Sequence, residues 1–312
     1  MGDYFRLTRV GNLLFLVVFG CLLRYAYIIP SLEQAGVEVA LSHIDFALIM
    51  LAEVLLAAGG NALNDYFDVQ TDMINRPETV VVGRSVDRRA ALLCHVLLTI
   101  VGLFAGFYVS FVLRKGSLAM MFLGVALALW FYSTHFKRQM LVGNVVVALL
   151  VALSGYVVVC VDFAAIDLAA GSFVTGCSPY SHVWYVVCTF CAFAFISNLG
   201  REIIKDMEDV EGDSRTNCRT VAVELGLQYS KVVVLTVEAF MLVILAVSLY
   251  ITGVMVMTIY GVVAVALPTL LLMWWVWRGE SKKDFHRASV LSKFIMLFGI
   301  LSLVLNYFIT KG

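Results

Sequence analysis

Long apolar segments separated by short polar ones dominate the chain. A helix that crosses a membrane needs about 20 mostly apolar residues, and nine stretches approach or exceed that length. They run at about residues 11–30, 44–64, 91–113, 117–135, 141–161, 182–200, 231–250, 254–277 and 290–309. The pattern predicts an all-α polytopic membrane protein, a bundle of nine transmembrane helices that forms a single domain over residues 1–312.

The composition supports this fold class. Hydrophobic residues make up 62% of the chain and charged residues 14%, and the mean hydropathy is +0.93. These values are far too apolar for a soluble domain of 312 residues. The formal net charge is zero and the charges are partitioned by topology, so nothing in the sequence supports nucleic-acid binding.

The basic residues predict the orientation of the chain. With the N-terminus placed inside, most of the 22 lysines and arginines fall in the cytoplasmic segments. The exceptions are Arg24, Arg114, Lys115 and Lys311. This positive-inside bias predicts a cytoplasmic N-terminus in a bacterial or archaeal cell membrane.

Two acidic clusters have identical spacing and follow even-numbered spans, so both are expected on the cytoplasmic side. Asp65, Asp68 and Asp72 follow the pattern D-x-x-D-x-x-x-D, and the same pattern recurs at 206, 209 and 213. At 100° per residue, the second and third carboxylates lie about −60° and −20° from the first, on one helical face. Crowded carboxylates repel one another unless a cation lies among them. Two such stripes facing each other would cage hard divalent ions, which often share their remaining sites with phosphate.

Both clusters lie in longer motifs. Residues 64–72 read NDYFDVQTD and continue into INRP, whereas residues 201–213 read REIIKDMEDVEGD. These motifs resemble the two signatures of the UbiA superfamily of intramembrane prenyltransferases. Further features similar to that family are Arg9, Asn12, Tyr132, Lys137, Arg138, Gly143, Asn144, Arg219, Thr220, Gly226, Ser289, Ser292 and Lys293. The resemblance covers nearly the whole chain in order.

Within the superfamily, INRP and KDMEDVEGD look most like the archaeal-type branch, the digeranylgeranylglyceryl phosphate synthases, which prenylate geranylgeranylglyceryl phosphate. The resemblance implies transfer of a polyprenyl group, geranylgeranyl in that branch, to a glycerol phosphate lipid with formation of an ether bond. One stretch departs from the branch. Its members usually continue with a further Arg, Pro and a P-S-G-like turn, whereas residues 78–84 here read ETVVVGR. In the family this loop lies next to the acceptor, so the departure bears on the identity of the acceptor more than on the prenyl-transfer chemistry.

The resemblance implies magnesium as the cofactor and a prenyl diphosphate as the donor. Two Mg²⁺ ions bridging the acidic stripes and the diphosphate would act as Lewis acids and as a template. We expect direct metal ligands at Asn64, Asp68, Asp72, Asp209 and Asp213. Asp65 and Asp206 are expected as further ligands or as acceptors in the second shell.

Basic and polar residues near the clusters are expected to bind the diphosphate. Guanidinium groups match phosphate oxygens and ammonium groups supply point charge. The candidates are Arg9, Asn12, Arg76, Tyr132, Lys137, Arg138 and Lys205. We expect catalytic roles for Lys137, Asp68, Asp72, Asp209 and Asp213. Lys137 and Arg138 could alternatively serve only as positively charged anchors at the cytoplasmic membrane surface.

Two alternatives remain open at this point. The acceptor could be an aromatic ring in quinone biosynthesis, such as a hydroxybenzoate or naphthoate, in place of a lipid. More distantly, a transporter of divalent cations or phosphate compounds could also present inward-facing carboxylates.

Three ionisable residues, Arg24, Glu53 and Glu238, lie within predicted spans. Burying such groups in a membrane is energetically costly, so we expect them to face the interior of the helix bundle.

Overall fold

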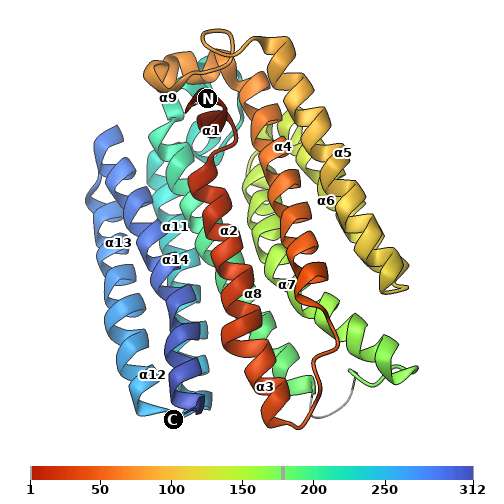
Figure 1. Cartoon of the computed structure of the whole chain (residues 1–312). Helices are drawn as coiled ribbons and strands as arrows, with labels where there is room; N and C mark the ends of the chain where they lie inside the picture. The colour runs from red at the N-terminus through yellow and green to blue at the C-terminus, as the bar shows by residue number, and fades with distance from the viewer. Residues whose placement is uncertain (1, 177–179, 312) are drawn as a thin grey trace. The chain divides into compact units, whose positions relative to one another are not determined.

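The computed structural model describes residues 2–176 and 180–311. In chain order the helices are α1 Gly2–Leu7, α2 Val10–Leu22, η1 Leu23–Ile28, α3 Ile29–Gln34, α4 His43–Asn75, η2 Pro77–Thr79, α5 Arg88–Val112, α6 Gly116–Thr134, η3 Phe136–Arg138, α7 Val142–Ala170, α8 Tyr180–Glu208, α9 Val210–Arg215, α10 Val221–Glu224, α11 Gly226–Thr252, α12 Met255–Tyr260, η4 Gly261–Ala266, α13 Leu267–Arg278 and α14 Lys282–Lys311 (Figure 1).

The predicted number and order of spans are confirmed. Within residues 2–176 and 180–311, nine helices are long and apolar enough to cross a membrane. Two of these spans are composite. The first, Val10–Gln34, joins α2, the π-helix η1 and α3, and the eighth, Met255–Arg278, joins α12, the π-helix η4 and α13. The fold class is therefore all-α, as the apolar runs predicted.

Several predicted boundaries are wrong, because the helices run past the apolar segments. The second span was expected to end near residue 64 but α4 continues to Asn75, and α8 continues from the expected end at 200 to Glu208. At the other end of the chain, α14 begins at Lys282 and not at 290. Polar residues such as these form helix as readily as apolar ones, so hydropathy alone underestimates helix length.

The chain divides into two compact units. The first contains residues 1–136 and 153–189, and the second contains residues 137–152 and 190–312. Both α7 and α8 begin in one unit and end in the other, so the chain passes between the units within helices.

Small residues let the helices of the first unit pack closely around α4. A Cβ atom on Gly59 would lie 2.8 Å from Thr99 Oγ1, and one on Gly60 would lie 2.8 Å from Leu129 Cδ2. His95 Nδ1 lies 2.9 Å from the carbonyl oxygen of Gly59. Close backbone approach at glycine is typical of helix packing in membranes, and it fixes α5 and α6 against α4.

A buried ion pair lies in the first unit. Arg24, in η1, is completely buried and its Nε lies 3.1 and 3.2 Å from the two carboxylate oxygens of Asp162 in α7. A second guanidinium nitrogen donates to the carbonyl of Leu41 at 2.8 Å, and the Phe46 ring lies 4.6 Å from the guanidinium carbon. Arg24 therefore faces the interior, as expected, and its partner is Asp162.

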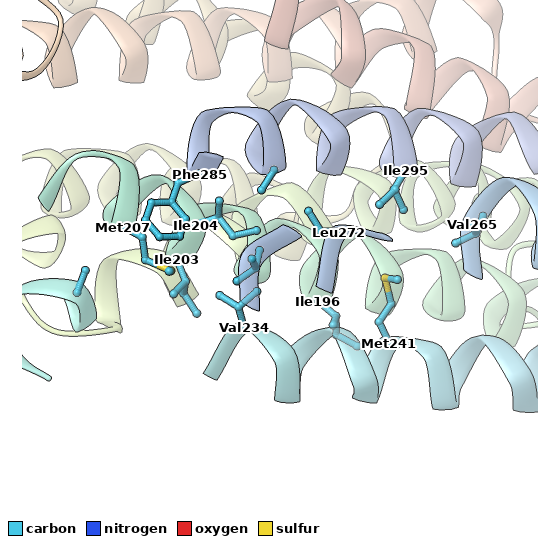
Figure 2. Packing of buried hydrophobic residues seen from close by; sticks show 13 residues of the cluster. Ile196, Ile203, Ile204, Met207, Val234, Met241, Val265, Leu272, Phe285 and Ile295 are labelled. Atoms are coloured by element: carbon cyan, nitrogen blue, oxygen red, sulfur yellow. The ribbon is translucent and has the colours of Figure 1, made fainter. Parts of the chain in front are cut away.

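The second unit has an apolar core of its own between α8, α11, α13 and α14. Figure 2 shows Ile203, Ile204 and Met207 of α8 close to Phe285 at the start of α14. Leu272 and Ile295 extend the same cluster along α13 and α14. This packing fixes the polar end of α8, which carries the second acidic motif.

Candidate active site

The first acidic motif lies on the last turns of one continuous helix. Helix α4 begins after Ser42, whose hydroxyl accepts a hydrogen bond from the Asp45 N–H at 3.0 Å, and it continues without interruption to Asn75. Asn64, Asp68 and Asp72 recur every four residues, so they share one face of this helix. Because α4 is also continuous through Asp65, the predicted common face of Asp65, Asp68 and Asp72 is confirmed.

Asp65 forms an ion pair with Arg9. The guanidinium Nη2 of Arg9 lies 2.6 Å from Asp65 Oδ1, and the side chains are 36% and 17% exposed. Arg9 has φ 54° and ψ 51°, the left-handed conformation, at the turn between α1 and α2. Asn61 holds the same turn, because its Nδ2 donates to the Thr8 carbonyl at 2.9 Å. The N-terminal turn is thus joined to α4 beside the acidic motif.

Arg9 also lies in the electrostatic field of Asp68 and Tyr132. Burial alone would lower the pKa of Arg9, but the charge of Asp65 and its hydrogen bond outweigh burial and raise that pKa. The guanidinium therefore remains protonated. The structure brings together Arg9, Asp65, Asp68 and Tyr132, four of the residues that the sequence singled out. Asn12 lies one turn further along α2 and is exposed.

The segment after the first motif folds back onto the helices of its own unit. Arg76 ends α4, with its N–H donating to the Asp72 carbonyl at 2.7 Å. Val81, Val82 and Val86 are buried in a cluster that also contains Leu7, Ala62 and Ala91. Two of the residues that depart from the archaeal-type pattern, Val81 and Val82, therefore contribute to a small apolar core, a packing role that the sequence did not predict.

In the second unit, Asp206 is held by an amide. Asn144 Nδ2 donates to Asp206 Oδ2 at 2.8 Å, joining the start of α7 to α8. The helix is interrupted one turn later at Asp209, which separates α8 from α9. Asp213 lies in α9 and is 8% exposed. The interruption therefore places Asp206 in α8 and Asp213 in α9, and the charge of Asp213 still acts on Asp206.

Glu202 lies between two basic residues and was missed by the sequence analysis. Arg201 Nη1 lies 2.7 Å from Glu202 Oε1, and Lys205 Nζ lies 2.8 Å from Glu202 Oε2. The spacing of three residues between Glu202 and Lys205 is the signal that indicates such a pair in a helix. Lys205, expected to bind diphosphate, is thus positioned by a carboxylate.

Lys137 and Arg138 lie in η3, at the start of the second unit. The carbonyl of Arg138 accepts a hydrogen bond from the Arg219 N–H at 3.1 Å. This contact brings the η3 turn against the segment that follows the second acidic motif. Arg138 and the second motif thus lie in the same unit.

The residues present suit a hard divalent cation, although neither unit contains a complete site of side chains alone. Among residues 2–176 and 180–311, no three His, Cys, Asp or Glu side chains are grouped so that they could hold a metal ion. Asn64 Oδ1, however, is buried and has no hydrogen-bond partner among the described residues. Mg²⁺ commonly takes one or two carboxylates and completes its shell with water and substrate phosphate, so this donor set fits it.

Comparison with known proteins identifies the family. Residues 12–301 match the UbiA prenyltransferase family. The chain belongs to the UbiA prenyltransferase family. It is accordingly a prenyltransferase and an integral multi-pass membrane protein, and the transporter alternative is set aside.

Relatives of this UbiA-family chain include archaeal enzymes. The digeranylgeranylglyceryl phosphate synthase of Methanopyrus kandleri is 32% identical over 270 residues, covering 86% of this chain and 90% of that protein. The enzyme of the same name from Thermococcus gammatolerans is 32% identical, covering 81% and 84%. A UbiA homologue from Archaeoglobus fulgidus, solved with GPP and Mg²⁺, shares the fold with a TM-score of 0.56 at 16% identity, covering 97% of this chain and 99% of that one.

Proposed function

We propose that this UbiA-family enzyme transfers a geranylgeranyl group from its diphosphate to geranylgeranylglyceryl phosphate and so forms an ether lipid. The observation that carries the proposal is that each acidic cluster has a base beside it: Arg9 forms an ion pair with Asp65, and the charge of Lys205, which is paired with Glu202, acts on Asp206. Relatives of about the same length that are named digeranylgeranylglyceryl phosphate synthase support the choice of acceptor.

Asn64, Asp68 and Asp72 in the first unit, and Asp209 and Asp213 in the second, would hold Mg²⁺. When bound, Mg²⁺ supplies charge neutralisation to the leaving diphosphate. Asp65 and Asp206 are each engaged by a side chain, Arg9 and Asn144 respectively. Those contacts favour an outer role for the two residues, in which they orient the neighbouring ligands.

Basic side chains bind the diphosphate in this proposal. Arg76, Lys137, Arg138 and Lys205 contact phosphate oxygens, and Arg9, Asn12 and Tyr132 support them from the first unit. The bond between prenyl C1 and the diphosphate oxygen breaks, and its electron pair leaves with the diphosphate. The acceptor hydroxyl oxygen then bonds to C1, and its proton passes to the released diphosphate.

In this proposal the two units act as one catalytic domain. The N-terminus and the active site face the cytoplasm. The distribution of lysine and arginine along the chain supports this orientation. Apolar helix surfaces enclose the prenyl chain and exclude water, which would otherwise consume an allylic cation.

Offering acceptors side by side tests the proposal. Purified full-length protein in liposomes receives geranylgeranyl diphosphate and Mg²⁺ with equal amounts of geranylgeranylglyceryl phosphate, hydroxybenzoate and dihydroxynaphthoate. We expect the doubly prenylated glyceryl phosphate as the main product by mass spectrometry. Product on an aromatic acceptor alone would overturn the lipid acceptor and leave the prenyltransferase assignment intact.

A further inference from the structure

A basic pocket lies where α8 ends and α14 begins. Four basic residues, Lys282, Lys283, His286 and Arg287, and the carboxylate of Glu208 line a cavity of about 290 Å³. All five residues belong to the second unit. Glu208 lies within the second acidic motif, next to Asp209, whereas the four bases of α14 belong to neither motif and are not among the diphosphate-binding residues proposed above.

The helix α14 presents these bases on its outer face. Phe285 and Ala288 are buried in the core of the second unit, at 1% and 0% exposure, and Figure 2 shows Phe285 beside Met207 and Ile204. Lys282, Lys283, His286 and Arg287 are spaced one and four residues apart and are all exposed. The first turn is capped by Asp284, which accepts from the Ser281 N–H at 3.1 Å and from its hydroxyl at 2.7 Å.

Glu208 anchors the imidazole within this basic pocket. Glu208 is 6% exposed, and one of its carboxylate oxygens lies 3.0 Å from His286 Nδ1. A carboxylate bound to one ring nitrogen fixes the orientation of an imidazole and leaves the other nitrogen for a ligand. Lysine and arginine side chains that only anchor a helix in the membrane extend into the lipid interface one by one. Here the basic side chains instead line a single cavity, next to the His286 ring that Glu208 holds in place.

The pocket carries a surplus of positive charge, which favours an anionic ligand. Lys282, Lys283 and Arg287 carry three permanent positive charges, and Glu208 in the pocket and Asp284 beside Arg287 offset two of them. The pocket lies at the ends of two membrane spans, Tyr180–Glu208 and Lys282–Thr310, the level at which lipid headgroups are found. Basic pockets between transmembrane helices at such a level bind anionic headgroups.

We propose that this pocket binds the phosphate monoester headgroup of an anionic membrane lipid. A monoester carries up to two negative charges and three terminal oxygens, whereas a phosphodiester carries one charge and two terminal oxygens, so three clustered bases favour the monoester. Arg287 supplies a guanidinium fork for phosphate oxygens, and the lysines add point charge. The acceptor in the proposed function is itself a phosphate monoester lipid, but the pocket contains none of the residues proposed there to bind the metal or the diphosphate.

The test measures lipid binding to the full-length protein in nanodiscs of phosphatidylcholine. Short-chain phosphatidic acid, phosphatidylglycerol and inorganic phosphate are titrated separately and binding is followed by microscale thermophoresis. We expect phosphatidic acid to bind most tightly. Arg287→Ala should raise its Kd about fivefold, which corresponds to about 1 kcal/mol for one base near a membrane surface.

Arg278→Ala is the matched control, because Arg278 is an exposed base in the last turn of α13 that does not line the pocket. Its Kd should change less than twofold. His286→Gln, which leaves the permanent charges in place, should weaken binding more than Arg278→Ala does. Thermal unfolding of each variant in the same nanodiscs checks that the protein is intact.

Three results would overturn the proposal. An equal effect of Arg278→Ala and Arg287→Ala would show a general surface charge effect. Inorganic phosphate binding as tightly as the lipid would assign the pocket to free phosphate. Phosphatidylglycerol binding as tightly as phosphatidic acid would remove the selectivity for a monoester.

Discussion

Arg9 donates a hydrogen bond of 2.6 Å to Asp65 from a turn in which Arg9 has left-handed backbone angles. A residue other than glycine in that conformation is uncommon and carries a conformational cost. The ion pair offsets that cost and joins the N-terminal turn to the acidic end of α4.

We predict that Arg9 and Asp65 act as a unit in turnover. Arg9→Gln and Asp65→Asn should each lower kcat/KM at least tenfold, since each leaves the other side chain without its charged partner. The double variant should be no worse than the poorer single variant, as expected for coupled residues. Steady-state kinetics of prenyl transfer give kcat/KM for the unaltered enzyme, the two single variants and the double variant. Arg6→Ala, an exposed base in α1, is the control, and additive losses would show that the two residues act separately.

The buried pair of Arg24 and Asp162 is predicted to be needed for folding. Arg24→Leu leaves the Asp162 carboxyl buried without its ionic partner, and removing one member of such a pair costs about 3–5 kcal/mol. The midpoint of unfolding in detergent should therefore fall strongly. Combining Arg24→Leu with Asp162→Leu should restore most of the loss in stability, because no buried carboxyl remains without a partner. A double variant less stable than Arg24→Leu would refute this explanation.

Glu53 is predicted to destabilise the protein. It is 8% exposed, and neither carboxylate oxygen has a hydrogen-bond partner among the described residues. Leaving such a group unsatisfied costs about 1–3 kcal/mol, so Glu53→Leu should raise the unfolding temperature. Glu33→Leu, an exposed position in α3, should have little effect. A lower unfolding temperature for Glu53→Leu would mean that the carboxylate has a stabilising partner.

Val82 is predicted to hold the segment after the first acidic motif in place. It is 1% exposed within the cluster of Val81, Val86 and Leu7. Val82→Asp places an unpaired charge in that cluster and should accelerate tryptic cleavage after the exposed Arg84 about tenfold. Glu78→Ala, an exposed position in the same segment, should leave the cleavage rate unchanged. Equal rates for Val82→Asp and the unaltered protein would contradict the packing role.

Local properties of the sequence predicted much of the fold. The length of each apolar run identifies a span, and the spacing of Asp65, Asp68 and Asp72 identifies a helical face, because both depend on neighbouring residues only. Helix ends were harder to predict. The polar residues from Asp65 to Asn75 lower the hydropathy without weakening the helix, so α4 extends further than its apolar run.

Contacts between distant residues could not be predicted. Arg24 and Asp162 are 138 positions apart, and Asn144 and Asp206 are 62 apart. Each of these four residues could have paired with another polar group, and only the packing of the helices determines which partner it meets. The sequence likewise did not predict the interruption of the helix at Asp209, which places Asp206 in α8 and Asp213 in α9.

The most direct test of the central claim measures prenyl transfer as a function of Mg²⁺ concentration, using one variant from each acidic motif. Chelation with EDTA should abolish transfer by the unaltered enzyme. Asp68→Ala and Asp213→Ala should have no detectable turnover at any Mg²⁺ concentration while remaining folded, whereas Glu211→Ala, an exposed acid in α9, should retain activity. Full turnover by either aspartate variant, or undiminished transfer in EDTA, would contradict the account.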